Sequence, residues 1–272
     1  MFDIHEIRKE FPILAEKING KDLCYLDNGA SAQKPRIVID SMVQAYQVEY
    51  ANVHRGLHYL SNLATENFEV VRGKVRRFLG AKSESEIIFT SGSTEALNLV
   101  SYSWGIPNLK AGDEIILSVA EHHSNIVPWH FLRERQGVVL KWVKPRLDGQ
   151  IHIEDILLMV NEKTKLIAIT HMSNVLGCIV DIKSLCIEAR KKNIVTVVDG
   201  SQAAVHMPVD VSDLDCDFYA ITGHKLYGPS SSGALFVSER RFDEMRPFHG
   251  GGAMIKSVTC EDVTYNEPPL KF

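Results

Sequence analysis

The sequence predicts an α/β fold in which a mainly parallel β-sheet is covered by helices on both faces. From residue 86 onward, the 272-residue chain repeats a short apolar segment, a turn of small or polar residues, and an amphipathic segment with helical spacing. This alternation is typical of parallel strands joined by covering helices. A composition of 45% hydrophobic and 24% charged residues suits a globular protein that buries a sizeable core.

The first part of the chain is predicted to be an arm. Asp3 to Glu10 fits a short helix, and Asn19-Gly20 fits a turn. Residues 23–26 are predicted to form a brief strand that leads into 27–32, a loop of small residues where a ligand can approach the backbone closely. A plain turn is the alternative for that loop.

Two helices follow the arm. Pro35 opens the first, which runs to about Tyr50, and the second ends at Gly80. The apolar face of the second helix is predicted to carry Val71, Val75, Phe78 and Leu79. Between the helices, residues 53–58 include His54, Arg55 and His58, which either contact an anionic substrate or are solvated loop residues.

The repeated pattern gives the remaining elements in order. Strands are predicted at 86–90, 114–119, 138–143, 166–170, 194–199, 218–222 and 234–237. Helices are predicted from the turn after residue 90 to about Trp104, up to Gly137, and at 153–160 and 182–192. Ligand sites in such sheets lie at the carboxyl ends of the strands, so the residues that follow each strand are the candidate site.

The turn Gly92-Ser93-Thr94 follows one strand and begins a helix. Free N–H groups and the helix dipole favour a phosphate at such a position, and an ordinary helix cap is the alternative. The turn lacks the Gly-Lys-Ser/Thr ending of a nucleoside triphosphate site. A phosphate on a different kind of ligand is therefore predicted.

Asp199 ends an apolar strand and is followed by Gly200, Ser201 and Gln202. A carboxylate delivered from a buried strand needs a cationic partner to offset its desolvation. Magnesium is disfavoured because no second acidic residue stands at a suitable spacing. A protonated ring nitrogen suits Asp199 better, through a charge-assisted hydrogen bond.

Lys225 lies in the run from Thr222 to Pro229, between small residues and a Gly-Pro stop. An amine held on a short loop at a sheet edge is a candidate Schiff-base nucleophile, whereas a solvated surface lysine is the alternative.

His122 and His123 follow another strand. At most one of them is expected to face the site, where its imidazole would stack on an aromatic ring. Neither His122 nor His123 belongs to a His-x-x-x-His pair that would support a metal. These parts together predict pyridoxal 5'-phosphate as the cofactor.

Charge and composition limit the partners and the location. A formal net charge of -4 without a basic block gives no reason to expect nucleic acid or an anionic membrane as a partner. The charged start of the chain does not resemble a signal peptide, and no segment approaches the ~20 apolar residues of a membrane span, so a cytoplasmic protein is expected. The scattered cysteines predict reduced thiols and neither a disulfide framework nor a zinc site.

At this point the motifs resemble those of a known family, the SufS-type cysteine desulfurases. These belong to the class V aminotransferase group of fold-type I pyridoxal-phosphate enzymes. The segments that carry the resemblance span nearly the whole chain in family order and are 25–35, 53–58, 121–129, 170–177, 198–202 and 223–229.

The resemblance implies a role for each candidate residue. Lys225 would be the catalytic residue that binds the cofactor covalently, and His122 would stack on the ring. Asp199 would pair with the ring nitrogen. Asn174 and Gln202 would contact the ring oxygen side. The phosphate would be held by Ser93, Thr94, Thr222 and His224.

The resemblance also implies an activity and partners. Family members convert L-cysteine to L-alanine and leave a persulfide on the enzyme, whose sulfur passes to an acceptor protein of the Suf system for iron-sulfur cluster assembly. A homodimer is implied. The family fold is a pyridoxal-phosphate-binding large domain with a small C-terminal domain, which gives an expected division into an arm (1–22), the large domain (23–252) and an extended tail (253–272).

The chain departs from the family pattern in several ways. The persulfide cysteine, an arginine for the substrate carboxylate and a phosphate contact across the dimer are expected beyond Phe272, so the chain resembles a C-terminally truncated member with impaired or no activity. Ser230-Ser231-Ser232 replaces a glycine-rich run, and Ser91 replaces an arginine; strain is expected in the serine run. Two alternatives are a non-catalytic remnant that dimerises or binds a sulfur acceptor, and a selenocysteine lyase.

Overall fold

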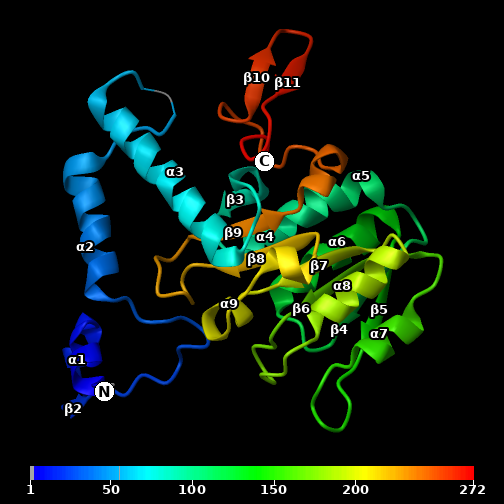
Figure 1. Ribbon diagram of the computed structural model, residues 1–272, viewed down its shortest axis with the longest axis horizontal. Coiled ribbons are helices and arrows are strands. Elements are labelled where there is room, and N and C mark those ends of the chain that lie inside the picture. The colour runs from blue at the N-terminus through cyan, green and yellow to red at the C-terminus, as the bar shows by residue number, and fades with distance from the viewer. Residues whose placement is uncertain (1–2, 55) are drawn as a thin grey trace.

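The centre of the structure, a computed structural model that describes residues 3–54 and 56–272, is a seven-stranded sheet (Figure 1). The strand order is β3-β9-β8-β7-β6-β4-β5. β9 pairs antiparallel with β3 and β8, and the other pairs are parallel. The strands are β3 (Ile87–Thr90), β4 (Glu114–Ser118), β5 (Val139–Val143), β6 (Thr164–Thr170), β7 (Val195–Asp199), β8 (Phe218–Thr222) and β9 (Gly233–Val237).

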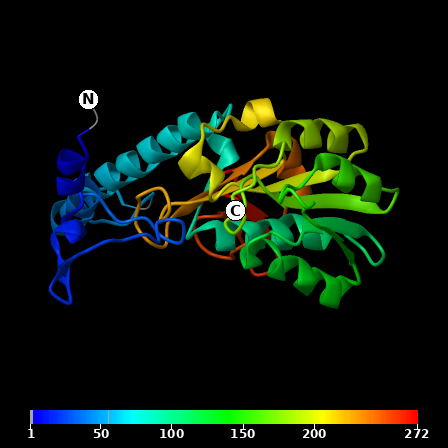
Figure 2. The same ribbon diagram turned by 90° about the horizontal axis from the view of Figure 1, so that it is seen from below.

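Helices cover both faces of this sheet, as Figure 2 shows. Both faces are apolar because side chains alternate along each strand: in β6, Leu166 and Ala168 join one core, whereas Ile167 and Ile169 join the other. One layer consists of α3 (Tyr59–Leu79), α7 (Ile153–Met159), α8 (Ile182–Lys191) and α10 (Val211–Leu214), and the other of α4 (Ser93–Leu99) and α6 (Val127–Gln136). The predicted α/β class, its mainly parallel sheet and its two helical layers are confirmed.

The shorter elements complete the two layers and their connections. The remaining α-helices are α1 (Ile4–Lys9), α2 (Arg36–Gln44), α5 (Ile106–Asn108) and α9 (Ala203–His206). π-helical turns extend α2 over Ala45–Glu49 and α4 over Val100–Gly105. The 3-10 turns are Pro12–Ala15, Glu84–Glu86, His123–Asn125 and η6 (Glu239–Glu244).

Glycine ends the helices where the sequence predicts it. Gly80 follows α3 and Gly137 follows α6, both in the left-handed region with φ of 68° and 74°. The predicted apolar face of α3 is only partly correct. Leu79 is buried, but Val71 and Phe78 are 45% and 49% exposed and line a shallow apolar hollow of about 680 Å³.

The predicted strand at 23–26 is wrong. The structure instead forms a small hairpin from β1 (Lys17–Ile18) and β2 (Lys21–Asp22) around the predicted Asn19-Gly20 turn. Both turn residues have positive φ, 54° and 75°, which is the turn geometry that matches strand twist in a two-residue hairpin. The strand ladder therefore ends at the Lys17–Asp22 pair, and the Leu23 N–H adds one further hydrogen bond, to the Glu16 carbonyl oxygen at 3.2 Å. No residue of α1 or α2 is buried.

The last residues also differ from the expected extended tail. β10 (Ile255–Val258) and β11 (Val263–Tyr265) form an antiparallel hairpin that stands apart from the main sheet in Figure 1. The chain then returns to η6, where Lys271 Nζ donates to the Phe242 carbonyl oxygen at 2.9 Å. Across residues 3–54 and 56–272, no helix has the length and apolar character needed to cross a membrane.

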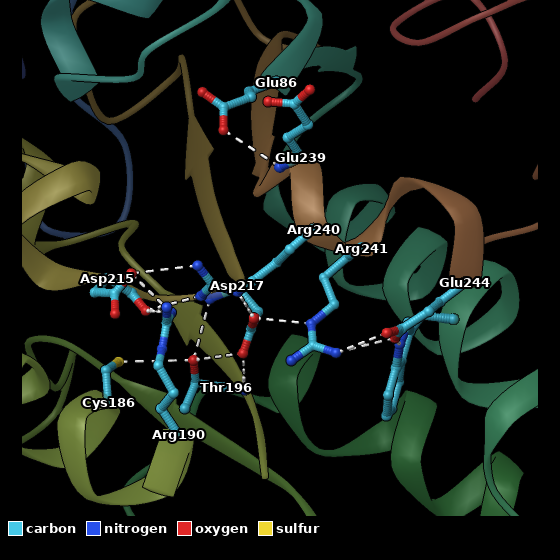
Figure 3. Close-up of polar contacts among 11 residues, drawn as sticks. Glu86, Cys186, Arg190, Thr196, Asp215, Asp217, Glu239, Arg240, Arg241 and Glu244 are labelled. Carbon is cyan, nitrogen blue, oxygen red and sulfur yellow. Dashed lines mark hydrogen bonds and ion pairs between the residues drawn. The ribbon is translucent and has the colours of Figure 1, made fainter. Parts of the chain in front are cut away.

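A polar cluster lies where β7 and β8 begin (Figure 3). Asp217 is 3% exposed. Its Oδ1 accepts hydrogen bonds from Arg240 Nε (2.6 Å) and Arg241 Nε (2.8 Å), and its Oδ2 accepts from the backbone N–H of Thr196 (2.9 Å) and its Oγ1 (3.1 Å). This carboxylate therefore ties η6 to the two central strands.

Candidate active site

A cavity of about 390 Å³ opens at the carboxyl ends of the central strands. Its volume lies within the range of small-molecule sites. Eight of the nine residues expected at the cofactor line it, and only Gln202 does not. The lining residues are Gly29, Ala30, Ser91, Gly92, Ser93, Thr94, Glu95, His122, Ser124, Asn174, Asp199, Ser201, Thr222, His224 and Lys225.

Asp199 ends β7 and is 4% exposed. Its Oδ1 accepts hydrogen bonds from the backbone N–H of Ser201 at 2.9 Å and from Ser201 Oγ at 2.6 Å. Its Oδ2 has no hydrogen-bond partner within the part of the chain that the structure describes. One oxygen of a buried carboxylate is therefore left for a donor or cation in the cavity.

Lys225 follows β8 on a loop that closes tightly on itself. The Gly223 N–H donates to the Ser232 carbonyl oxygen at 2.7 Å, and the Gly228 N–H donates to the Gly223 carbonyl oxygen at 2.8 Å. Burial lowers the pKa of Lys225, and the nearby Asp199 carboxylate opposes that shift. A lysine with a lowered pKa has more of its amine in the nucleophilic, uncharged form.

The small-residue loop at 27–32 packs against this lysine loop. The Ala32 N–H and Lys34 Nζ both donate to the His224 carbonyl oxygen, at 3.0 and 2.9 Å. Gln202 also holds this loop, because its Nε2 donates to the Gly29 carbonyl oxygen at 2.7 Å. The Gln202 amide nitrogen therefore holds the loop, which explains why this residue does not line the cavity.

His122 lines the cavity and His123 does not. Burial lowers the pKa of His122, and the Asp199 carboxylate opposes the shift. The His122 Nδ1 lies 2.9 Å from Ser124 Oγ, which lies 2.8 Å from Thr94 Oγ1. These contacts link the flat imidazole to the turn that begins α4.

Glu121 directly precedes His122 in the chain and is almost fully buried. Burial raises its pKa to about 8, against hydrogen bonds from Ser118 and Asn125 that act in the opposite direction. The Asn125 Nδ2 donates to Glu121 Oε2 at 2.7 Å, and Trp129 Nε1 donates to Asn125 Oδ1 at 3.2 Å. The turn that carries His122 is thus anchored to β4 and α6.

The turn at Ser91 to Thr94 needs a glycine, since Gly92 has a φ of 145°. No side chain caps the start of α4 among the described residues, so backbone N–H groups there remain for a ligand. Ser93 Oγ lies 2.6 Å from Ser201 Oγ. Glu95 faces the same turn and accepts a hydrogen bond from the Ser91 N–H, so that donor is already occupied.

Two further expectations from the sequence concern loops. Ser231 has a φ of 58°, a conformation that is strained for a residue with a side chain, as expected for the serine run. The described residues of the 53–58 loop do not line the cavity: His54 Nε2 pairs with Glu69 Oε1 at 3.0 Å, and the His58 side chain caps α3. Arg55 lies outside the described residues.

Glu121, Ser124 and Ser201 are site residues that the sequence motifs did not predict. A signal was present for Ser201, because an aspartate side chain often accepts a hydrogen bond from the backbone N–H two residues later, as Asp199 does here. The buried position of Glu121 depends on how β4, β6 and α6 come together, and no local pattern indicates it.

Comparisons with known proteins agree with this fold. Residues 24–272 match the family model described as aminotransferase class-V. The chain is 46% identical over all 272 residues to the cysteine desulfurase of Salmonella typhimurium and spans 67% of that protein.

Two solved structures share the fold over the whole chain. A cysteine desulfurase from Escherichia coli has a TM-score of 0.88 at 34% identity, and 67% of that chain is covered. The apo cysteine desulfurase from Thermococcus onnurineus has a TM-score of 0.92 at 36% identity, with 66% of that chain covered.

Proposed function

The chain belongs to the class V aminotransferase family, and from that premise we propose that it is a pyridoxal-phosphate-dependent cysteine desulfurase chain of the SufS type. The observation that carries the proposal is the meeting of Lys225 and Asp199 in one cavity. This placement gives a nucleophilic amine and a buried carboxylate to a single small ligand. Relatives that are named cysteine desulfurases support L-cysteine as the substrate.

The residues present fit this cofactor. The free Oδ2 of Asp199 suits a protonated ring nitrogen, and His122 offers a flat group for the ring. Asn174 and Gln202 would serve the ring oxygen side, Gln202 only if its amide releases the Gly29 carbonyl. The residues that would hold the phosphate are Ser93, Thr94, Thr222 and His224. When bound, the cofactor supplies an electron-poor ring that stabilises negative charge developing on the substrate.

Within this proposal, Lys225 has two tasks. Its Nζ would bind the cofactor covalently, and because burial lowers its pKa, more of the amine is in the uncharged form that can accept a proton. The Asp199 carboxylate would favour positive charge on the ring nitrogen. His122 excludes water from one face of the bound ring.

Sulfur transfer needs a thiolate close to the substrate, and none of the described residues lining the cavity is a cysteine. Cys178, Cys186 and Cys216 are buried, and burial raises the pKa of Cys186 to about 12. Cys24 and Cys260 are exposed elsewhere. We therefore propose that the 272-residue chain alone is impaired in converting L-cysteine to L-alanine and an enzyme persulfide.

The wider role is part of the same proposal. The sulfur would pass to an acceptor protein of the Suf system for iron-sulfur cluster assembly in the cytoplasm. Homodimerisation is supported by α2, which buries none of its residues yet exposes Ile37, Met42 and Val43. We keep the division into an arm (1–22, of which 1–2 lie outside the described residues), a large domain (23–252) and a C-terminal segment (253–272).

A cofactor titration tests the proposal. Adding pyridoxal 5'-phosphate should produce a visible absorbance band of the lysine adduct in the wild type and in Lys183→Ala, whose side chain pairs with Asp213 on the surface. Lys225→Ala should lack that band. Identical spectra for Lys225→Ala and the wild type would remove the cofactor assignment.

A second measurement concerns turnover. Alanine release from L-cysteine by the loaded chain should be slight, because no thiol lines the cavity. Robust release would show that the proposed impairment is wrong. Because that missing thiol also favours a non-catalytic remnant, binding of a sulfur-acceptor protein without turnover would support this second candidate function.

A further inference from the structure

We propose that Ser201 is a positioning residue that joins the two ends of the cofactor site through a one-way relay of hydroxyl groups. In this relay, Ser93 donates to Ser201, and Ser201 donates to Asp199. The inference rests on the proposed function, since it assigns how the chain's own residues share the ring and the phosphate of the proposed cofactor.

The geometry of the relay is short and buried. Ser201 Oγ lies 2.6 Å from Asp199 Oδ1 and 2.6 Å from Ser93 Oγ. The three residues are 6%, 4% and 7% exposed, respectively. The relay therefore connects the end of β7, where the ring nitrogen would lie, to the start of α4, where the phosphate would lie.

The direction of the relay follows from the number of hydroxyl protons. An ionised Asp199 can only accept hydrogen bonds, so the single hydroxyl proton of Ser201 is committed to it. A separation of 2.6 Å is typical of a hydroxyl donating to a carboxylate. Ser201 Oγ therefore accepts a hydrogen bond from Ser93. The single hydroxyl proton of Ser93 is used in that bond.

The relay changes the role assigned to Ser93. Its hydroxyl supports Asp199 through Ser201 and is not a donor to the phosphate, so only its backbone N–H remains for that group. Thr94 differs, because its Oγ1 contacts Ser124 Oγ at the exposed side of the cavity. The two neighbouring hydroxyl residues therefore act on opposite ends of the ligand.

Two non-covalent ligands distinguish binding at the ring end of the site from binding at the phosphate end. Pyridoxamine 5'-phosphate and pyridoxamine share the ring, but only the first has the phosphate. Affinities for the two are measured by calorimetry on the wild type, Ser93→Ala, Ser93→Thr and Thr94→Val. Ser93→Ala should weaken both ligands by the same factor, about threefold to tenfold, as expected for one hydrogen bond.

The control variants complete this experiment. Ser93→Thr retains the hydroxyl and should bind both ligands like the wild type, which distinguishes the relay from a general loss of packing. Thr94→Val should weaken the phosphorylated ligand selectively. If Ser93→Ala weakens only the phosphorylated ligand, the hydroxyl serves the phosphate and the relay is overturned.

A double-mutant cycle tests the coupling directly. Pyridoxamine affinity should fall about as much in Ser201→Ala as in the Ser93→Ala/Ser201→Ala double variant, because Ser93 acts only through Ser201. Additive losses would overturn the relay while leaving the proposed cofactor intact. Failure of the wild type to bind either ligand, together with an absent lysine adduct, would instead overturn the proposed function and the relay with it.

Discussion

Asp199 and Asp217 are almost equally buried, 4% and 3% exposed, and stand at opposite ends of neighbouring strands. Asp217 has donors on both carboxylate oxygens, from two arginines and from Thr196 (Figure 3). Asp199 has donors on only one oxygen, both from Ser201. Burial alone therefore does not separate a structural carboxylate from a candidate functional one.

The difference lies in how completely each group is satisfied. A fully paired buried carboxylate contributes to the fold, since removing it leaves its donors without an acceptor. A carboxylate with one oxygen left open toward a cavity is stabilised further only when a ligand arrives. The two ends of the sheet can therefore be compared by one measurement, the free energy of unfolding with and without ligand.

The largest expected effect is a loss of stability on changing Asp217, the structural carboxylate. Asp217→Asn should lower the free energy of unfolding of the ligand-free chain by about 3 kcal/mol, because Arg240 and Arg241 both lose their shared anion. Asp199→Asn should change it by less than about 1 kcal/mol, because the amide oxygen still accepts from Ser201. Urea unfolding of both variants provides the measurement.

For ligand affinity, the order of the two variants should be the reverse of the order for stability. Asp199→Asn should weaken pyridoxamine 5'-phosphate binding by at least about tenfold, whereas folded Asp217→Asn should bind it like the wild type. Equal losses of stability in the two variants would contradict the distinction.

The next effect concerns a third buried carboxyl, Glu121, whose pKa is raised to about 8 by burial. From its ordinary value of 4.5 up to about 8, the folded chain holds a proton that the unfolded chain releases. Stability should then fall with rising pH by up to about 1.4 kcal/mol per unit. His171, whose pKa burial lowers from 6.5 to about 4, acts in the opposite direction below pH 6.5.

Below pH 6.5 the opposite effects of Glu121 and His171 on the free energy of unfolding largely cancel. The loss of stability due to Glu121 should therefore be measurable between pH 6.5 and about 8. Over that interval it amounts to about 2 kcal/mol. Glu121→Gln should remove this fall, whereas Glu162→Gln at an exposed turn should retain it. Unfolding curves at a series of pH values measure both, and an unchanged slope in Glu121→Gln would show that Glu121 is ionised in the folded chain.

The smallest expected effect compares the hydroxyl donor of Asp217, on Thr196, with its arginine donors. Thr196→Val preserves the side-chain volume but removes the hydroxyl that lies 3.1 Å from Asp217 Oδ2. The free energy of unfolding should fall by about 1 to 2 kcal/mol, because the Asp217 N–H also loses the Thr196 hydroxyl as its acceptor, while the backbone N–H of residue 196 still donates to the carboxylate. Thr264→Val, which removes an exposed hydroxyl partner of Ser257, should have a smaller effect. A loss as large as that of Asp217→Asn would contradict the assigned division between hydroxyl and arginine donors.

Local sequence patterns predicted much of the sheet. Its strands are apolar runs ended by polar residues, and Gly80 and Gly137 end helices because left-handed backbone favours glycine. The order of chemistry-bearing residues after the strands predicted most of the cavity lining for the same reason: parallel strands deliver their carboxyl ends to one edge.

The features that sequence did not predict depend on tertiary contacts. Residues 23–26 are a short apolar run, but the strand ladder ends at Asp22, and among their backbone N–H groups only that of Leu23 has a described acceptor, the Glu16 carbonyl oxygen at 3.2 Å. Val71 and Phe78 have helical spacing, yet no described residue covers them fully. The sequence motif assigned the Gln202 side chain to the cofactor. In the structure its amide nitrogen donates to the Gly29 carbonyl oxygen, a contact between residues far apart in the sequence.

The contact between Lys34 Nζ and the His224 carbonyl oxygen joins residues separated by 190 positions in the chain. Contacts of such separation carry a large loop-closure entropy and slow the folding of the segments that they join. The contact between the lysine loop and the small-residue loop therefore forms only after both halves of the chain have met. During refolding, the capacity to capture a ligand at Lys225 reports a later event than the recovery of helices and strands.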